Sequence, residues 1–129
     1  MIYIQIEDSL KIETNSFDFF SELFKNTAQR VLDFTETNSK DEITIVLTTN
    51  QEIYKLNSKF LGHDYPTDVL AFPSDEIDID TESNYLGDII ISYERAFEQA
   101  QQSNHSLEDE LKLLSVHAVS YTHLTLPTN

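Results

Sequence analysis

A leucine-rich stretch near the carboxy end, Ser106–Ala118 (SLEDELKLLSVHA), constrains the fold more than any other part of the chain. Ser106 and Asp109 have the spacing of a helix-capping pair, in which a serine oxygen accepts a hydrogen bond from an amide of the first turn. His117 follows two leucines by three and four residues, so we expect its imidazole on a buried or half-buried flank. Apolar side chains at helical spacing predict the buried stripe: Leu107, Leu111, Leu114 and Ala118.

The rest of the chain alternates between strand and helix patterns. Period-two alternation or runs of β-branched residues predict four strands, and apolar residues at helical spacing predict three further helices. The predicted order is β-α-β-α-β-β-α-α, which indicates one α+β domain with a four-stranded mixed sheet packed with helices. The segments are strand 2–7, helix 16–35, strand 42–48, a helix from 49 to 62, a strand between Pro66 and Pro73, strand 85–91, a helix from Ser92, and the helix described above.

Local signals fix several of these boundaries. Thr49, with Glu52 three residues later, predicts a capping box, and Gly62 predicts a left-handed helix end. Two prolines bracket the third strand, so we expect a short strand at or near a sheet edge. The acidic segment 74–84 lacks the spacing and the glycine of a calcium loop and is expected to be a solvated loop.

Charge and composition narrow the function. The chain has 129 residues, 23 Asp and Glu against eight Lys and Arg, and a formal net charge of −15. A field of that sign repels phosphate backbones, so a general nucleic-acid-binding surface is not expected. The absence of cysteine excludes disulfides and thiolate catalysis, and any metal requires histidine and carboxylate ligands. Without a membrane-length apolar run or a basic leader, a cytoplasmic protein is expected.

The last eleven residues, Val119–Asn129 (VSYTHLTLPTN), break the pattern. The apolar stripe lapses, charged residues vanish, and threonines and Pro127 disfavour a continued helix. We therefore expect the helix to stop after Ala118 and residues 119–129 to be a non-native tail. For that reason we draw no function from Tyr121 or His123.

Three candidate positions have two readings each. A single histidine such as His117 on an apolar flank is either a hydrogen-bonded core residue or one of two helical histidines that bind a metal ion. Asp68 and Asp88 are expected at the mouths of apolar strands, where an acid caps a turn, pairs, or faces a cleft. His63 is expected in an exposed loop, and His105 is expected to face solvent.

A set of spaced motifs resembles the YbeY family of bacterial rRNA maturation endoribonucleases. The set is Leu56-Asn57, Pro66–Pro73 (PTDVLAFP), Leu86–Ile89 (LGDI), Ser92, Gln99-Ala100, Glu110-Leu111 and His117. The resemblance implies an α+β fold and a zinc-dependent hydrolase of single-stranded RNA. It further implies a role in small-subunit rRNA 3′-end processing and ribosome quality control, with rRNA, ribosomal proteins and ribosome-assembly factors as partners. Asp68, Asp88 and Phe72 become candidates for its pocket.

The chain departs from the family pattern at its metal motif. Family members carry H-G-x-L-H-x-x-G-Y-D-H, whose histidines hold one zinc ion, whereas here only His117 is present, followed by Ala118. Tyr121 and Pro127 stand at the second and third ligand positions. Three neutral imidazoles leave one coordination position open for an activated water. We therefore expect the intact family member to bind zinc and this chain to lack both zinc and activity.

Two alternatives stay open at this point. A zinc peptidase also uses histidines on a helix, although the glutamate that usually follows the first histidine is absent. A non-catalytic acidic module that docks on a basic ribosomal protein would use the net charge directly. A further departure concerns Leu61, which stands where many family members carry arginine, so an expected phosphate contact is missing.

Overall fold

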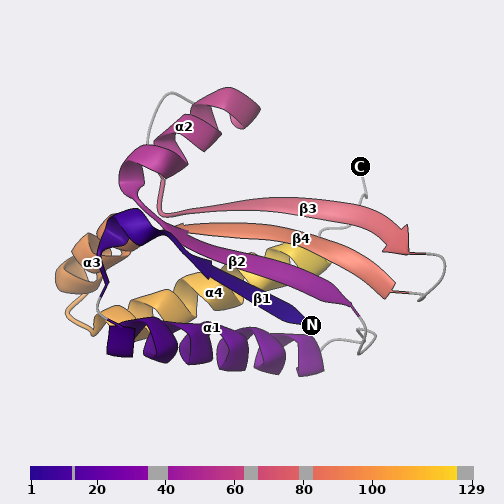
Figure 1. Cartoon of the computed structure of the whole chain (residues 1–129), viewed down its shortest axis with the longest axis horizontal. Coiled ribbons are helices and arrows are strands. Elements are labelled where there is room, and N and C mark those ends of the chain that lie inside the picture. The colour runs from indigo at the N-terminus through magenta and orange to yellow at the C-terminus, as the bar shows by residue number, and fades with distance from the viewer. Residues whose placement is uncertain (13, 35–40, 63–66, 79–82, 125–129) are drawn as a thin grey trace.

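The computed structural model describes residues 1–12, 14–34, 41–62, 67–78 and 83–124 (Figure 1). The elements follow the predicted order, with one short 3-10 helix, Asp8–Leu10, that the sequence did not predict. The strands are β1 (Ile2–Ile6), β2 (Glu42–Thr48), β3 (Val69–Asp78) and β4 (Ser83–Ser92), and the helices are α1 (Thr14–Phe34), α2 (Asn50–Leu61), α3 (Tyr93–Gln102) and α4 (Leu107–Leu124).

The four strands form one mixed sheet in the order β1-β2-β4-β3. β1 pairs in parallel with β2, to which α1 connects it, and β2 pairs in parallel with β4 after a connection through α2 and β3. β3 and β4 are consecutive in the chain and pair antiparallel. The predicted α+β fold with a four-stranded mixed sheet is therefore confirmed, as is the predicted edge position of β3.

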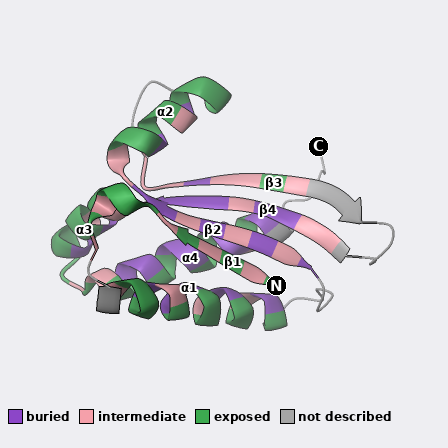
Figure 2. Cartoon of the chain, in the orientation of Figure 1, coloured by how far each residue is buried: buried purple, intermediate pink, exposed green. Residues whose placement is uncertain are grey.

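The two faces of the sheet are covered unequally. α1 and α4 lie along one face, and α2 lies on the other side near one end of the sheet (Figure 1). The inner face of β2 and β4 packs with α1 and α4 into the main core, whose buried positions are purple in Figure 2. The opposite face carries a smaller cluster beneath α2, formed by Ile53, Leu70 and Ile90. No helix in the described ranges is long and apolar enough to cross a membrane.

Side-chain caps begin the helices where the sequence predicts them. The Thr49 hydroxyl accepts a hydrogen bond from the Glu52 amide at 3.1 Å, and Gly62 ends α2 at a φ of 70°. The Ser106 hydroxyl accepts from the Asp109 amide at 3.1 Å and so begins α4. Each cap satisfies a backbone group that the helix itself leaves unpaired. These predictions are confirmed.

The prediction that β3 is short is wrong. The strand runs for ten residues through Pro73 to Asp78, with a register shift between Pro73 and Glu76. A proline is tolerated because β3 is an edge strand and needs hydrogen bonds on one side only. The prediction of a solvated loop over residues 74–84 is also wrong, because residues 74–78 belong to β3 and residues 83–84 belong to β4. Residues 79–82 lie outside the described residues.

The prediction that the last helix stops after Ala118 is also wrong, because α4 continues to Leu124. Val119 is fully buried in the main core, so the apolar face continues past the predicted end. Thr122 is buried as well, and its hydroxyl donates to the Val119 carbonyl at 2.9 Å. This hydrogen bond satisfies the Thr122 hydroxyl, which would be costly to bury without a partner. The non-native origin of residues 119–129 stays a prediction.

A glycine in β4 permits the close approach of β3. Gly87 has a φ of 142°, a backbone conformation that residues with a side chain rarely adopt. It pairs with Pro73 across the hairpin. A Cβ at this position would overlap the carbonyl oxygen of Phe72 and stand 3.0 Å from the Cα of Pro73. The glycine also follows Leu86, which the register shift between β2 and β4 leaves unpaired. Gly87 therefore allows the bulge and the strand contact together.

We predict that Gly87→Ala lowers the free energy of unfolding by about 3 kcal/mol, since it adds both backbone strain and a backbone clash. Gly62→Ala is the matched control, because Gly62 has a φ of 70° but nothing within 4 Å of the added Cβ. The control is expected to cost about 1 kcal/mol. Urea unfolding followed by circular dichroism measures both changes, and equal losses in the two variants would contradict the argument.

Candidate functional site

His117 lies on the flank of α4 that turns away from α1. The flank facing α1 carries Glu108, Lys112 and Val116. His117 is rotated by about 100° from Val116, and α4 also packs against β3 and β4. α1 packs against β1, which is the edge strand opposite β3. The flank of α4 that carries His117 faces away from α1 and therefore lies toward the β3 edge of the sheet.

The predicted burial of His117 is wrong, because the residue is exposed. The buried stripe of α4 includes Leu114 and Ala118, and His117 is rotated from these by about 60° and 100°. Leu113, one turn earlier on the same flank, is itself 45% exposed. The apolar neighbours that suggested burial therefore include one that faces solvent. The imidazole is accessible, as a ligand-binding group must be.

Tyr121 follows His117 by one turn on this flank and is 52% exposed. Because α4 stays helical to Leu124, the second expected ligand position is presented beside the first. Three other positions named from the sequence, His63, Pro127 and the side chain of His123, lie outside the described residues.

Asp68 stands directly before β3, as predicted, and is half-buried. Its carbonyl accepts a hydrogen bond from the Ser92 amide at 2.9 Å, which ties the start of β3 to the end of β4. Its carboxylate accepts from the Thr67 hydroxyl at 3.3 Å. The sequence left open whether Asp68 caps a turn, pairs with another group or faces a cleft. Its described contacts fit a residue that caps the turn before β3.

Asp88 is not at a strand mouth, and that prediction is wrong. It lies inside β4, paired with Thr44 on β2 and Phe72 on β3. Its carboxylate accepts a hydrogen bond from the Tyr85 hydroxyl, and that hydroxyl shares a second hydrogen bond, of 2.7 Å, with Thr44. The acid is therefore one member of a polar cluster on the sheet, formed by Thr44, Tyr85 and Asp88.

The structure does not bring Asp88 and Phe72 to His117. Phe72 packs against the cluster beneath α2 and lies edge-on to Phe60, with ring centroids 6.0 Å apart. Asp88 is its cross-strand partner and so shares that face. α4 lies against the opposite face of the sheet. The role of Asp68, Asp88 and Phe72 as pocket residues stays a prediction, without support from proximity to His117.

Sequence reasoning missed Tyr85 and Thr44. Strict alternation places residues three apart on opposite faces of a strand, so Tyr85 and Asp88 would not be expected to meet. The register shift at the start of the β2–β4 pairing adds one residue to β4 and returns both side chains to one face. The only sequence signal was Gly87 within the LGDI motif, which is typical of a bulge but does not specify one.

The prediction that His105 faces solvent is wrong. Its Nε2 lies 2.6 Å from Oε1 of Glu110, and Glu110 is buried. The chain turns sharply here, because Asn104 has a φ of 60° and the His105 amide donates to the Ala100 carbonyl. This turn folds the histidine back over the first turn of α4, so His105 is a structural partner of Glu110.

A three-ligand zinc site does not fit the part of the chain that the structure describes. Within those residues, no three His, Asp or Glu side chains are grouped so that they could hold a metal ion. His117 is the only histidine on its flank of α4 in the described helix, and His105 is engaged by Glu110. The expected arginine position is occupied by Leu61, the exposed last residue of α2, which offers no charge.

The four-stranded mixed sheet and its helices define a small α+β protein, and a solved structure matches this fold. The solution structure of TM1509 from Thermotoga maritima matches with a TM-score of 0.60 and 25% sequence identity, covering 95% of this chain and 71% of that chain.

Sequence comparison gives the family. A family model described as Endoribonuclease YbeY matches residues 5–125. A protein named Endoribonuclease YbeY from Alkaliphilus oremlandii is 40% identical over 104 residues, covering 79% of this chain and 69% of the relative. One of the same name from Lachnoclostridium phytofermentans is 33% identical over 143 residues, covering 94% and 85%. The chain belongs to the YbeY family.

The Tyr85 phenol provides a pH test of the polar cluster on the sheet. Burial raises the pKa of Tyr85 from 10.0 to about 12, the bond to Asp88 acts in the same direction, and the bond to Thr44 opposes it. A pKa raised on folding gives stability that is complete below pH 10 and is lost as the pH rises through 12. We predict that the urea midpoint of the parent chain falls more steeply across this window than that of Tyr85→Phe.

Asp88→Asn is the companion variant, since it removes a group that raises the pKa of Tyr85. Its loss of stability is expected to begin at the same pH as in the parent chain, near 10, but to be smaller and to end at a lower pH, because the pKa of Tyr85 in the folded state lies closer to its value in the unfolded chain. Tyr121→Phe, which removes an exposed phenol, serves as the control and is expected to keep the parent profile. Identical profiles for the parent chain and Tyr85→Phe would rule out a Tyr85 contribution.

Proposed function

We propose that the protein derives from a metal-dependent endoribonuclease that cleaves single-stranded rRNA during 3′-end maturation of the small-subunit RNA. The observation that supports this most strongly is membership of the YbeY family, with a match over residues 5–125 and relatives named as endoribonucleases. The described parts of the family motifs lie on or beside regular elements: residues 67–73 (TDVLAFP) lead into β3, LGDI lies in β4, and His117 is on α4.

Because the net charge is strongly negative, attraction for RNA has to come from a local site on the surface. At −15, the protein as a whole repels a phosphate backbone. A bound divalent cation would supply local attraction for phosphate and a water activated for attack on a phosphodiester. His117 contributes an exposed imidazole on the β3 side of α4, where one metal ligand is proposed. In relatives with the full motif, we propose zinc as that cation.

We further propose that the 129-residue chain does not retain zinc and is inactive. Its described residues supply one accessible imidazole on α4, while a catalytic zinc site uses three protein ligands. Tyr121 stands where a second imidazole would be one turn from His117, on the same exposed flank. The scaffold is therefore suited to the site, but the donor set is incomplete.

We predict that the parent chain purifies without stoichiometric zinc and that Tyr121→His raises its Zn²⁺ affinity about tenfold or more, or at least about 1.4 kcal/mol. The pair at 117 and 121 would share one helix face within reach of one ion. Isothermal titration with Zn²⁺ and elemental analysis of the purified chain give the two readouts.

A variant carrying both Tyr121→His and Pro127→His is expected to cleave single-stranded RNA in a chelator-sensitive manner.

Val116→His is the matched control, because it adds a histidine on the flank that faces α1 and cannot share an ion with His117. Its Zn²⁺ affinity is expected to equal that of the parent chain. Tightly held stoichiometric zinc in the parent chain would refute the incomplete-site proposal. Equal affinities for the two histidine variants would refute the assignment of His117 and residue 121 to one site.

A second candidate function follows from the net charge of −15 alone. An acidic module would bind a basic ribosomal protein by electrostatic steering, without cleaving RNA. The two candidates separate in one comparison: binding to a basic partner falls steeply as salt is added, whereas chelator-sensitive cleavage by the repaired variant reports the nuclease.

A further inference from the structure

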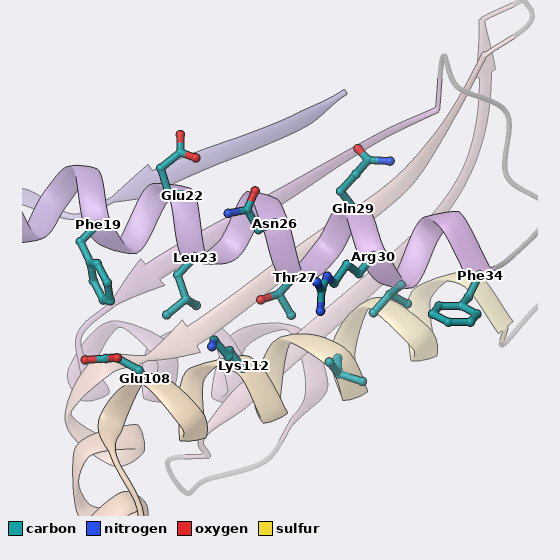
Figure 3. A pocket seen from close by; sticks show the side chains of 12 residues that line it. Phe19, Glu22, Leu23, Asn26, Thr27, Gln29, Arg30, Phe34, Glu108 and Lys112 are labelled. Atoms are coloured by element: carbon teal, nitrogen blue, oxygen red, sulfur yellow. The ribbon is translucent and has the colours of Figure 1, made fainter.

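An open groove runs between α1 and α4 on the side away from the sheet. Its volume is about 950 Å³, and twelve side chains from these two helices line it (Figure 3). Arg30 and Lys112 extend into the space between the helices, while Phe19 and Phe34 stand near opposite ends (Figure 3). None of these four residues belongs to the proposed metal site. The groove is therefore a separate feature of the molecule.

One stripe of α1 forms a wall of this groove. It comprises Phe19, Leu23, Asn26, Arg30 and Phe34, which recur every three or four residues along one flank of the helix. Phe19 is 47% exposed and Phe34 is 93% exposed. Large aromatic side chains exposed along a regular stripe mark a surface that another helix can cover.

The groove differs in charge from the rest of the protein. Its lining contains Glu22 and Glu108 against Arg30 and Lys112, so its charges cancel, while the whole chain carries −15. Among the described residues, neither Arg30 nor Lys112 forms a salt bridge, although acids outnumber bases 23 to eight. A neutral surface of this kind is where two acidic molecules meet with least repulsion.

The stripe complements itself when reversed. Two antiparallel copies of α1, related by a two-fold axis at Asn26 and Thr27, would place Phe19 opposite Phe34 of the second copy. Leu23 is already buried in the main core, so the Arg30 of the second copy that lies opposite it would contribute through its charged end, which reaches toward the exposed Glu22. Asn26 would meet Thr27 at the axis. An isologous dimer requires a patch with this self-complementarity.

We propose that this groove is a homodimer interface in which α1 packs antiparallel against α1 of a second copy, between the α4 helices. Single-stranded RNA is the weaker occupant, because Phe19 and Phe34 are about 22 Å apart along the helix, too far to stack neighbouring bases. A basic protein partner would bring its charges toward Arg30 and Lys112. A second copy offers apolar, polar and charged groups in the matching order.

The test measures oligomeric state by sedimentation over a range of concentration and salt. The parent chain is expected to form a species of twice its 14.9 kDa mass, and the dimer fraction should rise with salt, because screening weakens the repulsion between two strongly acidic copies. Asn26→Lys places two like charges together at the axis and is expected to raise the dimer dissociation constant about tenfold or more. Circular dichroism verifies that the variant stays folded.

Asp18→Asn is the control, since it adds the same unit of charge to an exposed position of α1 outside the groove. Because the chain has no cysteine, Asn26→Cys should form a disulfide-linked dimer under mild oxidation, and Asp18→Cys should not. A chain that stays monomeric at all concentrations and salts would overturn the proposal. So would a dimer that survives Asn26→Lys, or a monomer that binds single-stranded RNA through Arg30.

Discussion

The packing of α4 against the inner face of β3 and β4 is the contact on which the other features depend. Leu111 and Val119 of α4 are fully buried in one hydrophobic cluster with Ile45 and Ile89 of the sheet. Burying a side chain of this size stabilises a fold by about 1.5–3 kcal/mol, so several such contacts fix the rotation of the helix. Once that rotation is fixed, His117 faces solvent on one flank and Lys112 lines the groove on the other.

The fold was largely predictable because its signals are local. The Thr49 and Ser106 caps, the Gly62 helix end and the alternation of β1 each act within a few residues, and each was confirmed. The edge position of β3 also followed from one local property, the missing amide hydrogen of Pro73. Boundaries failed where tertiary contacts overrode propensity, as they do where Val119 joins the core and extends α4.

The candidate site was less predictable, because it depends on geometry that spans elements. The face on which Asp88 lies is set by a register shift between two strands that are distant in sequence. The exposure of His117 depends on the phase of α4, and apolar neighbours three and four residues away do not determine that phase. The pairing of His105 with the buried Glu110 arises from a tight turn that a polar Ser-Asn-His-Ser segment does not specify.

The same packing makes the stability of the scaffold independent of the side chains at positions 117 and 121. His117 and Tyr121 are both exposed and belong to neither hydrophobic cluster, so the core does not depend on which side chains occupy these positions. Surface substitutions of this kind usually change stability by less than about 0.5 kcal/mol. The side chains at these two positions can therefore change while the family fold is kept, because Leu111, Leu114 and Ala118 continue to hold α4 in place.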